Sequence, residues 1–466
     1  MKKLNYFLTI MLSLAFVIAS AQSSSGKLDK KTITEIQNSF QNTPENTALI
    51  NSITHNDIKR LSENRFNEGK INHLVNTKVS THGISNQRSS GRCWLYTGLN
   101  TIKPIVLNKY DIKDFEFSQT YSFFWDQFEK ANLFLEIAIT TADKPIDDRK
   151  VEWMMKNPIG DGGQWTTFAD IVKKYGVVPA SAMPDTYQSK NTRMMSRLLA
   201  RKLREDALEL RNLADNNANA KDLASTKVEM LKDIYRILVL SLGEPPQQFV
   251  WQYKTKEGKA SEPKTYTPKQ FYKEVVGINV DDYVMFMNDP SRDYYKLYEV
   301  EYDRNLVEGA NWKYINLPMD VIKKFAVKSI QGNEAMYLSC DVGKQLDTKT
   351  GYLDVNLYDY NDIFGVTFGM DKTARIESFD SGSSHGMALI GVNILKDGTT
   401  DKWLLENSWG VEKGDHGYLT MTDAWFGEYM FRLVVNKKYI DADILKILDS
   451  KPIMLPPWDP MFASEE

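Results

Sequence analysis

Two hydrophobic patterns divide this chain and constrain its fold. Between residues 190 and 242, apolar side chains recur every three or four positions on one face of a predicted helix: Met195, Leu199, Leu203, Ala207 and Leu210. Gly243 and the prolines after it end this segment. After residue 335 the pattern changes to short β-branched and aromatic runs, at 387–394, 401–406 and 430–435, which are typical of strands. We therefore expect an α+β protein with a helical part and a β-rich part.

The composition permits a large buried core and excludes several classes of protein. Of the 466 residues, 42% are hydrophobic and 26% are charged, as in ordinary globular proteins. A formal charge of −3 is too balanced for a nucleic-acid coat or a polybasic membrane binder, so we expect no nucleic-acid partner. Acidic residues alternate with the basic ones at 193–211, which indicates a solvated helix face. Two cysteines and five histidines exclude a zinc ribbon or a disulfide framework.

Residues 1–21 have the order of a secretory signal peptide. Lys2 and Lys3 precede an apolar run over 6–19, and Ala19-Ser20-Ala21 offers a small-residue cleavage site. The run is shorter than the ~20 residues that span a bilayer, so a membrane anchor is the weaker interpretation. We expect an exported protein, periplasmic or secreted, without membrane contact after cleavage. Removal of Lys2 and Lys3 takes the formal charge from −3 to −5.

A loop that contains Gly91 brings Cys93 to the start of a predicted helix, in the string NQRSSGRCWL. The positive end of the helix macrodipole favours the thiolate, which is the nucleophilic form of cysteine. Gln87 lies on the flanking loop, where its amide NH₂ could join the Cys93 backbone N–H as an oxyanion hole. An isolated cysteine is more often a small buried hydrophobe, so this interpretation depends on further residues.

Two strings far downstream supply those residues. SSHGMALI places His385 at the start of an apolar strand, and ENSWG places Asn407 directly after another strand. A histidine base needs a partner on its second ring nitrogen, and an asparagine carbonyl accepts that N–H without adding charge. Trp409 would shield the pair from water. The order Gln, Cys, His, Asn with wide gaps predicts a two-lobed thiol protease.

On these motifs the chain resembles the papain superfamily of cysteine peptidases and, within it, the bleomycin hydrolase and aminopeptidase C branch. The superfamily motifs are QRSSGRCW, GDGGQW, SSHGMALIGV and ENSWG. The branch motifs are FEFSQTYSFFWDQFEKANLF, SLGEPPQQFVWQY, SCDVGKQ, GYLTMTDAWFGEY and PPWDPM. They extend from about residue 30 to the end of the sequence. The resemblance implies a papain-like two-lobe fold, with a helical lobe and a β-barrel-like lobe, and a homohexameric assembly.

Patterns and resemblance together imply six segments along the chain. They are a signal peptide (1–21), an N-terminal helical segment (22–75), a helical lobe with the nucleophile (76–184), a helical insertion (185–330), a β-rich lobe with the histidine and asparagine (331–440) and a C-terminal arm that enters the active-site cleft (441–466).

The resemblance also implies roles for individual residues in a cysteine aminopeptidase that needs no metal or organic cofactor. Gly162 and Gly163 are similar to the paired glycines that let the substrate backbone approach closely. Trp409 and Glu466 are further expected substrate-binding residues. The expected catalytic residues are the oxyanion donor Gln87, the nucleophile Cys93, the general base and acid His385 and the imidazole orienter Asn407.

The resemblance implies that the terminal carboxylate at Glu466 meets the α-ammonium of a peptide substrate and limits cleavage to N-terminal residues. Phe462 and the two glutamates after it depart from the small residues usual in relatives, so trimming of the tail or a shifted cleavage position stays open. An endopeptidase with a displaced tail and a non-catalytic scaffold are the alternatives. A Cys93–Cys340 disulfide would consume the nucleophile, and we interpret Cys340 as structural.

Overall fold

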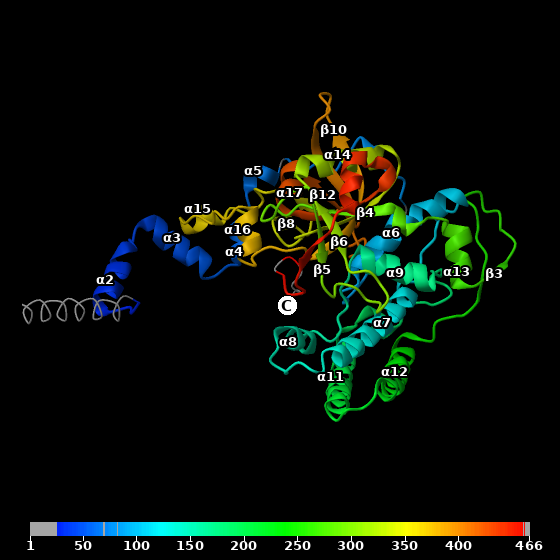
Figure 1. The fold of residues 1–466 in the computed structure, drawn as a ribbon. Coiled ribbons are helices and arrows are strands. Elements are labelled where there is room, and N and C mark those ends of the chain that lie inside the picture. Colours follow the sequence, from blue (N-terminus) through cyan, green and yellow to red (C-terminus); the bar gives the residue numbers. More distant parts are fainter. Residues whose placement is uncertain (1–25, 69, 82, 460, 462–466) are drawn as a thin grey trace, which may run out of the picture. The chain divides into compact units, whose positions relative to one another are not determined.

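The computed structural model describes residues 26–68, 70–81, 83–459 and 461 (Figure 1). The expected signal peptide and Glu466 lie outside these residues. The chain divides into two compact units, one made of residues 1–63 and 359–366 and the other of residues 64–358 and 367–466. Among the described residues, no helix has both the length and the hydropathy of a membrane span.

The smaller unit is helical. It contains α2 (Lys30–Ser39), α3 (Pro44–Ile53), α4 (Ile58–Leu61) and α15 (Tyr360–Phe364). The Asp29 side chain caps α2 and the Thr43 side chain caps α3, each by accepting a hydrogen bond from a first-turn backbone N–H. No residue of these four helices is buried, so they have no core of their own.

The larger unit contains the remaining helices. The bounds of its α-helices are α5 (Arg65–Glu68), α6 (Cys93–Lys109), α7 (Gln119–Thr140), α8 (Arg149–Lys156), α9 (Trp165–Tyr175), α10 (Tyr187–Lys190), α11 (Arg193–Asp215), α12 (Ala220–Leu242), α13 (Pro268–Phe271), α14 (Met319–Gln331), α16 (Lys372–Glu377), α17 (Asp423–Tyr429) and α18 (Ala442–Leu445). Short turns of other helix types are η1 (Tyr272–Val276), η2 (Val280–Asp282), η3 (Lys437–Tyr439) and η4 (Lys446–Asp449).

The long helical segment forms as its periodicity predicts. Each of the five apolar residues between Met195 and Leu210 is buried on α11. A turn at 216–219 starts a second helix, α12, which ends at Gly243 with φ of +89°, a conformation that favours glycine. α11 and α12 pack against each other and against α7, at the bottom of Figure 1.

A mixed sheet forms the second lobe of the larger unit. In the described part its strands follow the order β14-β5-β6-β4-β13-β7-β10-β11-β12-β9-β8, and β1 pairs with β10 as the twelfth strand. The bounds are β1 (Thr77–Lys78), β4 (Tyr283–Met287), β5 (Lys296–Val300), β6 (Lys313–Asn316), β7 (Met336–Cys340), β8 (Leu346–Asp347), β9 (Tyr352–Leu353), β10 (His385–Ile394), β11 (Thr400–Glu406), β12 (Tyr418–Thr422), β13 (Met430–Asn436) and β14 (Ile453–Leu455). A separate hairpin joins β2 (Phe249–Trp251) to β3 (Lys264–Tyr266).

The strands of the sheet show that one predicted segment is wrong in part. The segment 185–330 was expected to be a helical insertion, but its residues 283–316 form β4, β5 and β6 of the main sheet. These strands are only four or five residues long, and segments that short do not distinguish a buried strand from a buried helix by periodicity. Pairing decides their conformation: β4 pairs with β13, which lies more than one hundred residues further along the chain, and β6 joins β5 to β4.

Two hydrophobic cores correspond to the two lobes. One joins buried side chains of α6, α7, α9, α11 and α12, and the other joins those of β7, β10, β11, β12 and β13 with α14 and α17. α6 lies where the lobes meet, because it contacts α7 and α9 on one side and β7 and β10 on the other.

Candidate active site

Cys93 is the first residue of α6, as its sequence context predicts. The helix has no side-chain cap, since the preceding Arg92 has no hydrogen-bond acceptor in its side chain. The Cys93 thiol is partly buried, Cys340 is fully buried, and neither is in a disulfide. Cys340 lies at the end of β7, opposite His385 of β10, which agrees with its expected structural role.

His385 and Asn407 meet as expected. Antiparallel pairing of β10 and β11 places the first residue of β10 beside the residue that follows β11. His385 Nε2 lies 2.8 Å from Asn407 Oδ1, and both residues are buried. The Trp409 ring covers the imidazole at a centroid distance of 4.8 Å. The imidazole is therefore held in one orientation and shielded on one face.

Gln87 is hydrogen-bonded to Ser408, the residue that follows Asn407. The Gln87 backbone N–H donates to the Ser408 carbonyl at 2.8 Å, and its Oε1 accepts from Ser408 Oγ at 2.6 Å. Its Nε2 donates to the Ser90 carbonyl at 2.7 Å. An amide NH₂ has two hydrogens, so the second can still serve an oxyanion.

The start of α6, the start of β10 and the Gln87 loop border one cleft of about 770 Å³. Its lining includes Gln87, Cys93 and His385 together with Gly162 and Gly163, so the structure brings these five predicted residues to one place. Asn407 and Trp409 contact His385 from behind. Of the predicted site residues, Glu466 alone lies outside the described part of the chain.

Comparison with known proteins agrees with this geometry. The profile of the Peptidase C1-like family matches residues 27–462. Aminopeptidase C of Listeria innocua serovar 6a is 39% identical over 91% of this chain and 95% of its own length. Bleomycin hydrolase of Homo sapiens is 38% identical over 95% of this chain and 100% of its own length.

The chain belongs to the Peptidase C1-like family. The crystal structure of PepW from Lactobacillus rhamnosis HN001 superimposes with a TM-score of 0.91 at 38% identity, over 94% of this chain and 99% of that one. The fold is therefore the papain-like α+β fold, and the protein is a cysteine-type peptidase.

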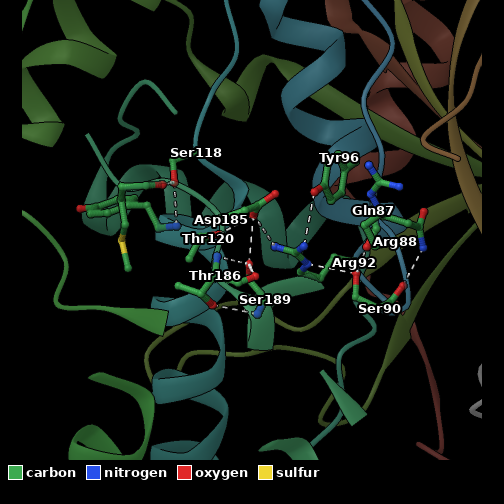
Figure 2. A network of polar contacts seen from close by, with 12 residues as sticks. Gln87, Arg88, Ser90, Arg92, Tyr96, Ser118, Thr120, Asp185, Thr186 and Ser189 are labelled. Atoms are coloured by element: carbon green, nitrogen blue, oxygen red, sulfur yellow. Dashed lines mark hydrogen bonds and ion pairs between the residues drawn. The ribbon is translucent and has the colours of Figure 1, made fainter. Parts of the chain in front are cut away.

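Arg92 supports the loop between Gln87 and Cys93 from inside the helical lobe. It is fully buried, and Figure 2 shows its guanidinium between Ser90, Tyr96 and Asp185. Arg92 Nε donates to Ser90 Oγ at 3.1 Å, and Nη1 lies 3.6 Å from the Asp185 carboxylate. Asp185 in turn accepts hydrogen bonds from Thr120 and Ser189. The loop between Gln87 and Cys93 is thus tied to the lobe behind it.

The glycine loop of the cleft is held by Lys130 on α7. Its ammonium donates to the carbonyls of Gly160 at 3.1 Å and Gly162 at 2.6 Å, and it pairs with the buried Asp126 at 2.7 Å. Sequence reasoning missed Lys130, although its spacing of four residues from Asp126 is the signal of a helical ion pair. Lys130 also lines the cleft and gives it positive charge.

Charged residues beyond the catalytic ones also line the cleft. Burial raises the pKa of Asp303, while Arg432 opposes that change. Burial lowers the pKa of Arg432, while Asp303 opposes it. Gln164 Nε2 donates to Asp303 Oδ1 at 3.3 Å. No motif predicted this group, because Asp303 and Arg432 lie far apart in the sequence and only the folded sheet brings them to one cleft.

The C-terminal arm reaches the same cleft, which Pro457 and Met461 help to line. Three arginines contact it: Arg149 lies over the Trp458 ring at 4.3 Å, Arg292 pairs with Asp459 at 2.5 Å, and Arg432 donates to the Met461 carbonyl at 3.2 Å. The arm is therefore held at its last described residues.

Proposed function

We propose that this peptidase is a cysteine aminopeptidase that removes N-terminal residues from peptides through an acyl-enzyme on Cys93. The observation that carries the proposal is the 2.8 Å contact between His385 and Asn407 in a cleft that Cys93 also lines. The names of its relatives, aminopeptidase C and bleomycin hydrolase, support the specificity for free N-termini. The arm residues in the cleft support it as well, because they fill space that an internal peptide segment would need.

The proposed reaction uses four residues. The Cys93 thiolate attacks the first peptide carbonyl, while the Gln87 amide and the Cys93 backbone N–H bind the oxyanion. The His385 imidazolium gives its proton to the leaving amine, the C–N bond breaks, and a thioester remains. His385 then takes a proton from water as the water attacks the thioester, which releases the amino acid and restores the thiolate. Asn407 keeps the imidazole in the required orientation.

The test compares an aminoacyl reporter that has a free amine with its N-acetylated twin. Faster hydrolysis of the free reporter is expected, and faster hydrolysis of the blocked one would contradict aminopeptidase specificity. Cys93→Ala should abolish turnover by removing the nucleophile. Cys340→Ala is the matched control, because it removes the other thiol from a position on β7 that does not line the cleft.

Export is part of the proposal. Its support is the order of charge, apolar run and small residues over 1–21. Expression of the full chain in a bacterium, followed by N-terminal sequencing of the periplasmic fraction, should find a mature start after Ala21. Recovery of the uncleaved chain from the cytoplasm would contradict it.

We also propose that the peptidase is a homohexamer, on the basis of the family resemblance. The helices of the smaller unit bury none of their own residues and expose Ile33, Ile36 and Phe40, which suits burial against another surface. Mass photometry of the purified protein should show six copies. A monomer at micromolar concentration would contradict the proposal.

A further inference from the structure

A buried ion pair lies behind the catalytic residues, between the two lobes. Lys103 lies on α6, ten residues after Cys93, and Glu406 is the last residue of β11, immediately before Asn407. Lys103 Nζ and Glu406 Oε1 are 3.5 Å apart. Neither residue is more than 1% exposed. The helix that begins at Cys93 therefore carries one charge of the pair, and the strand that ends next to Asn407 carries the other.

The ammonium of Lys103 has two further contacts. It lies 3.3 Å from the Gly83 carbonyl, on the segment that leads into Gln87, and 3.0 Å from Glu116 Oε1. The side chain of Glu116 is 39% exposed, whereas that of Glu406 is fully buried. Water can therefore solvate the Glu116 carboxylate if Lys103 is removed, but it cannot reach the Glu406 carboxylate.

Each charge of the pair favours the ionised form of the other, against the effect of burial. Burial raises the pKa of Glu406, and the charge of Lys103 opposes that rise. Burial acts to lower the pKa of Lys103, but Glu406 and Glu116 outweigh it and raise the pKa. Removing one partner leaves an uncompensated buried charge, which is strongly destabilising. Replacing both by neutral groups is far milder, so the pair's effect is on arrangement more than on stability.

The pair lies next to the contacts that join the two lobes at the active site. Two residues after Glu406, the Ser408 backbone and side chain bind Gln87, and the Gly410 N–H donates to the Ser85 carbonyl at 3.1 Å. A sliding of α6 against β11 would separate the buried charges and would shift Cys93 relative to His385. Displacements of this kind strongly reduce the rate of a reaction that depends on alignment.

We infer that Lys103 and Glu406 are positioning residues whose ion pair holds the Cys93 helix and the Asn407 loop in the register that catalysis needs. The inference rests on the proposed thiol mechanism. Neither residue lines the cleft, so they act through Cys93, Asn407 and Gln87 and not on the substrate.

A double-mutant cycle tests this inference. Lys103→Met and Glu406→Gln should each lower kcat roughly tenfold to hundredfold, with KM changed by less than about twofold, because alignment and not binding is impaired. The double variant should have a kcat no lower than that of the worse single variant, because no lone charge remains in the interface. The rate at which iodoacetamide labels Cys93 in the single variants should fall with kcat, at temperatures well below their unfolding midpoints.

Asp206→Asn is the matched control. Asp206 is a fully buried carboxylate that pairs with the partly exposed Lys202 at 2.9 Å within α11, so its replacement removes a buried charge without affecting the contact between lobes. This variant should unfold at a lower temperature but keep the wild-type kcat.

Two outcomes would overturn the inference. The first is that the Lys103 and Glu406 variants unfold at a lower temperature yet keep the wild-type kcat and labelling rate, which would make the pair merely structural. The second applies if both single variants fail to fold: a wild-type kcat in the double variant would have the same meaning. Failure of the wild-type protein to be labelled at Cys93 would instead contradict the proposed function, so the two failures are distinguishable.

Discussion

Gly162 and Gly163 are neighbours in the chain but lack a side chain for different reasons. A Cβ on Gly163 would lie 2.7 Å from the Trp94 ring and 2.8 Å from Thr167 Oγ1, whereas one on Gly162 would meet no protein atom within 4 Å. The sequence predicted substrate approach at both positions, but Gly163 also allows the loop to pack against Trp94 behind the nucleophile. Gly162 alone faces open space in the cleft.

Gly163→Ala should therefore lower the free energy of unfolding by about 1–3 kcal/mol, as overpacking does, and lower kcat because Trp94 adjoins Cys93. Gly162→Ala should leave the unfolding temperature unchanged and raise KM, because the new methyl group occupies space for the substrate backbone. Thermal unfolding and steady-state kinetics on the two variants check this difference. Equal behaviour of the two variants would contradict it.

At the scale of elements, α17 is joined to β11 and α14 through Asp423. Its carboxylate accepts hydrogen bonds from Thr400 Oγ1 at 2.6 Å and Trp403 Nε1 at 2.9 Å and pairs with Lys323 at 2.6 Å. Burial acts to raise the pKa of Asp423, but these partners outweigh it and lower the pKa. A lowered carboxyl pKa gives stability that is present above the unfolded value of about 4 and is lost as pH falls through the folded value.

Asp423→Asn should therefore cost about 1–3 kcal/mol of unfolding free energy at pH 7, because charge-assisted hydrogen bonds are lost. The difference from wild type should shrink below about pH 4, where Asp423 of the unfolded wild-type chain takes up a proton while the folded carboxylate still resists protonation. Urea denaturation at pH 7 and pH 3.5 measures both values. A difference that grows as pH falls would contradict the stated direction of the pKa shift.

At the scale of the molecule, the C-terminal arm and the cleft are joined by arginines that the sequence did not single out. Arg292→Met removes the 2.5 Å ion pair with Asp459 and should loosen the arm. Rates on the N-acetylated reporter should then rise about tenfold relative to the free-amine reporter, the ratio that ~1.4 kcal/mol produces. Lys446→Met, which removes an exposed pair with Asp443 in the same arm, should leave the ratio unchanged.

How far the sequence predicts the site depends on how local the signal is. Cys93 was predicted because a glycine-containing loop and a helix start adjoin it, and His385 because it precedes an apolar run that became β10. Arg432 and Asp303 have no such neighbours, and their shared cleft arises from strands that pair across the sheet. The strands β4, β5 and β6 were missed for the same reason, since segments of four or five residues do not determine their own conformation.

By itself, the sequence determined the α+β class and the helices with 3.6-residue periodicity, and it predicted the four residues of the proposed thiol site, because those signals are local or are carried in recognisable motifs. Only the tertiary structure decided which strands join the central sheet, that Lys103 pairs with Glu406 and that arginines hold the arm. Those contacts join residues far apart in the chain. Burial makes an unpaired charge costly and a partner necessary, and no stretch of sequence experiences that burial alone.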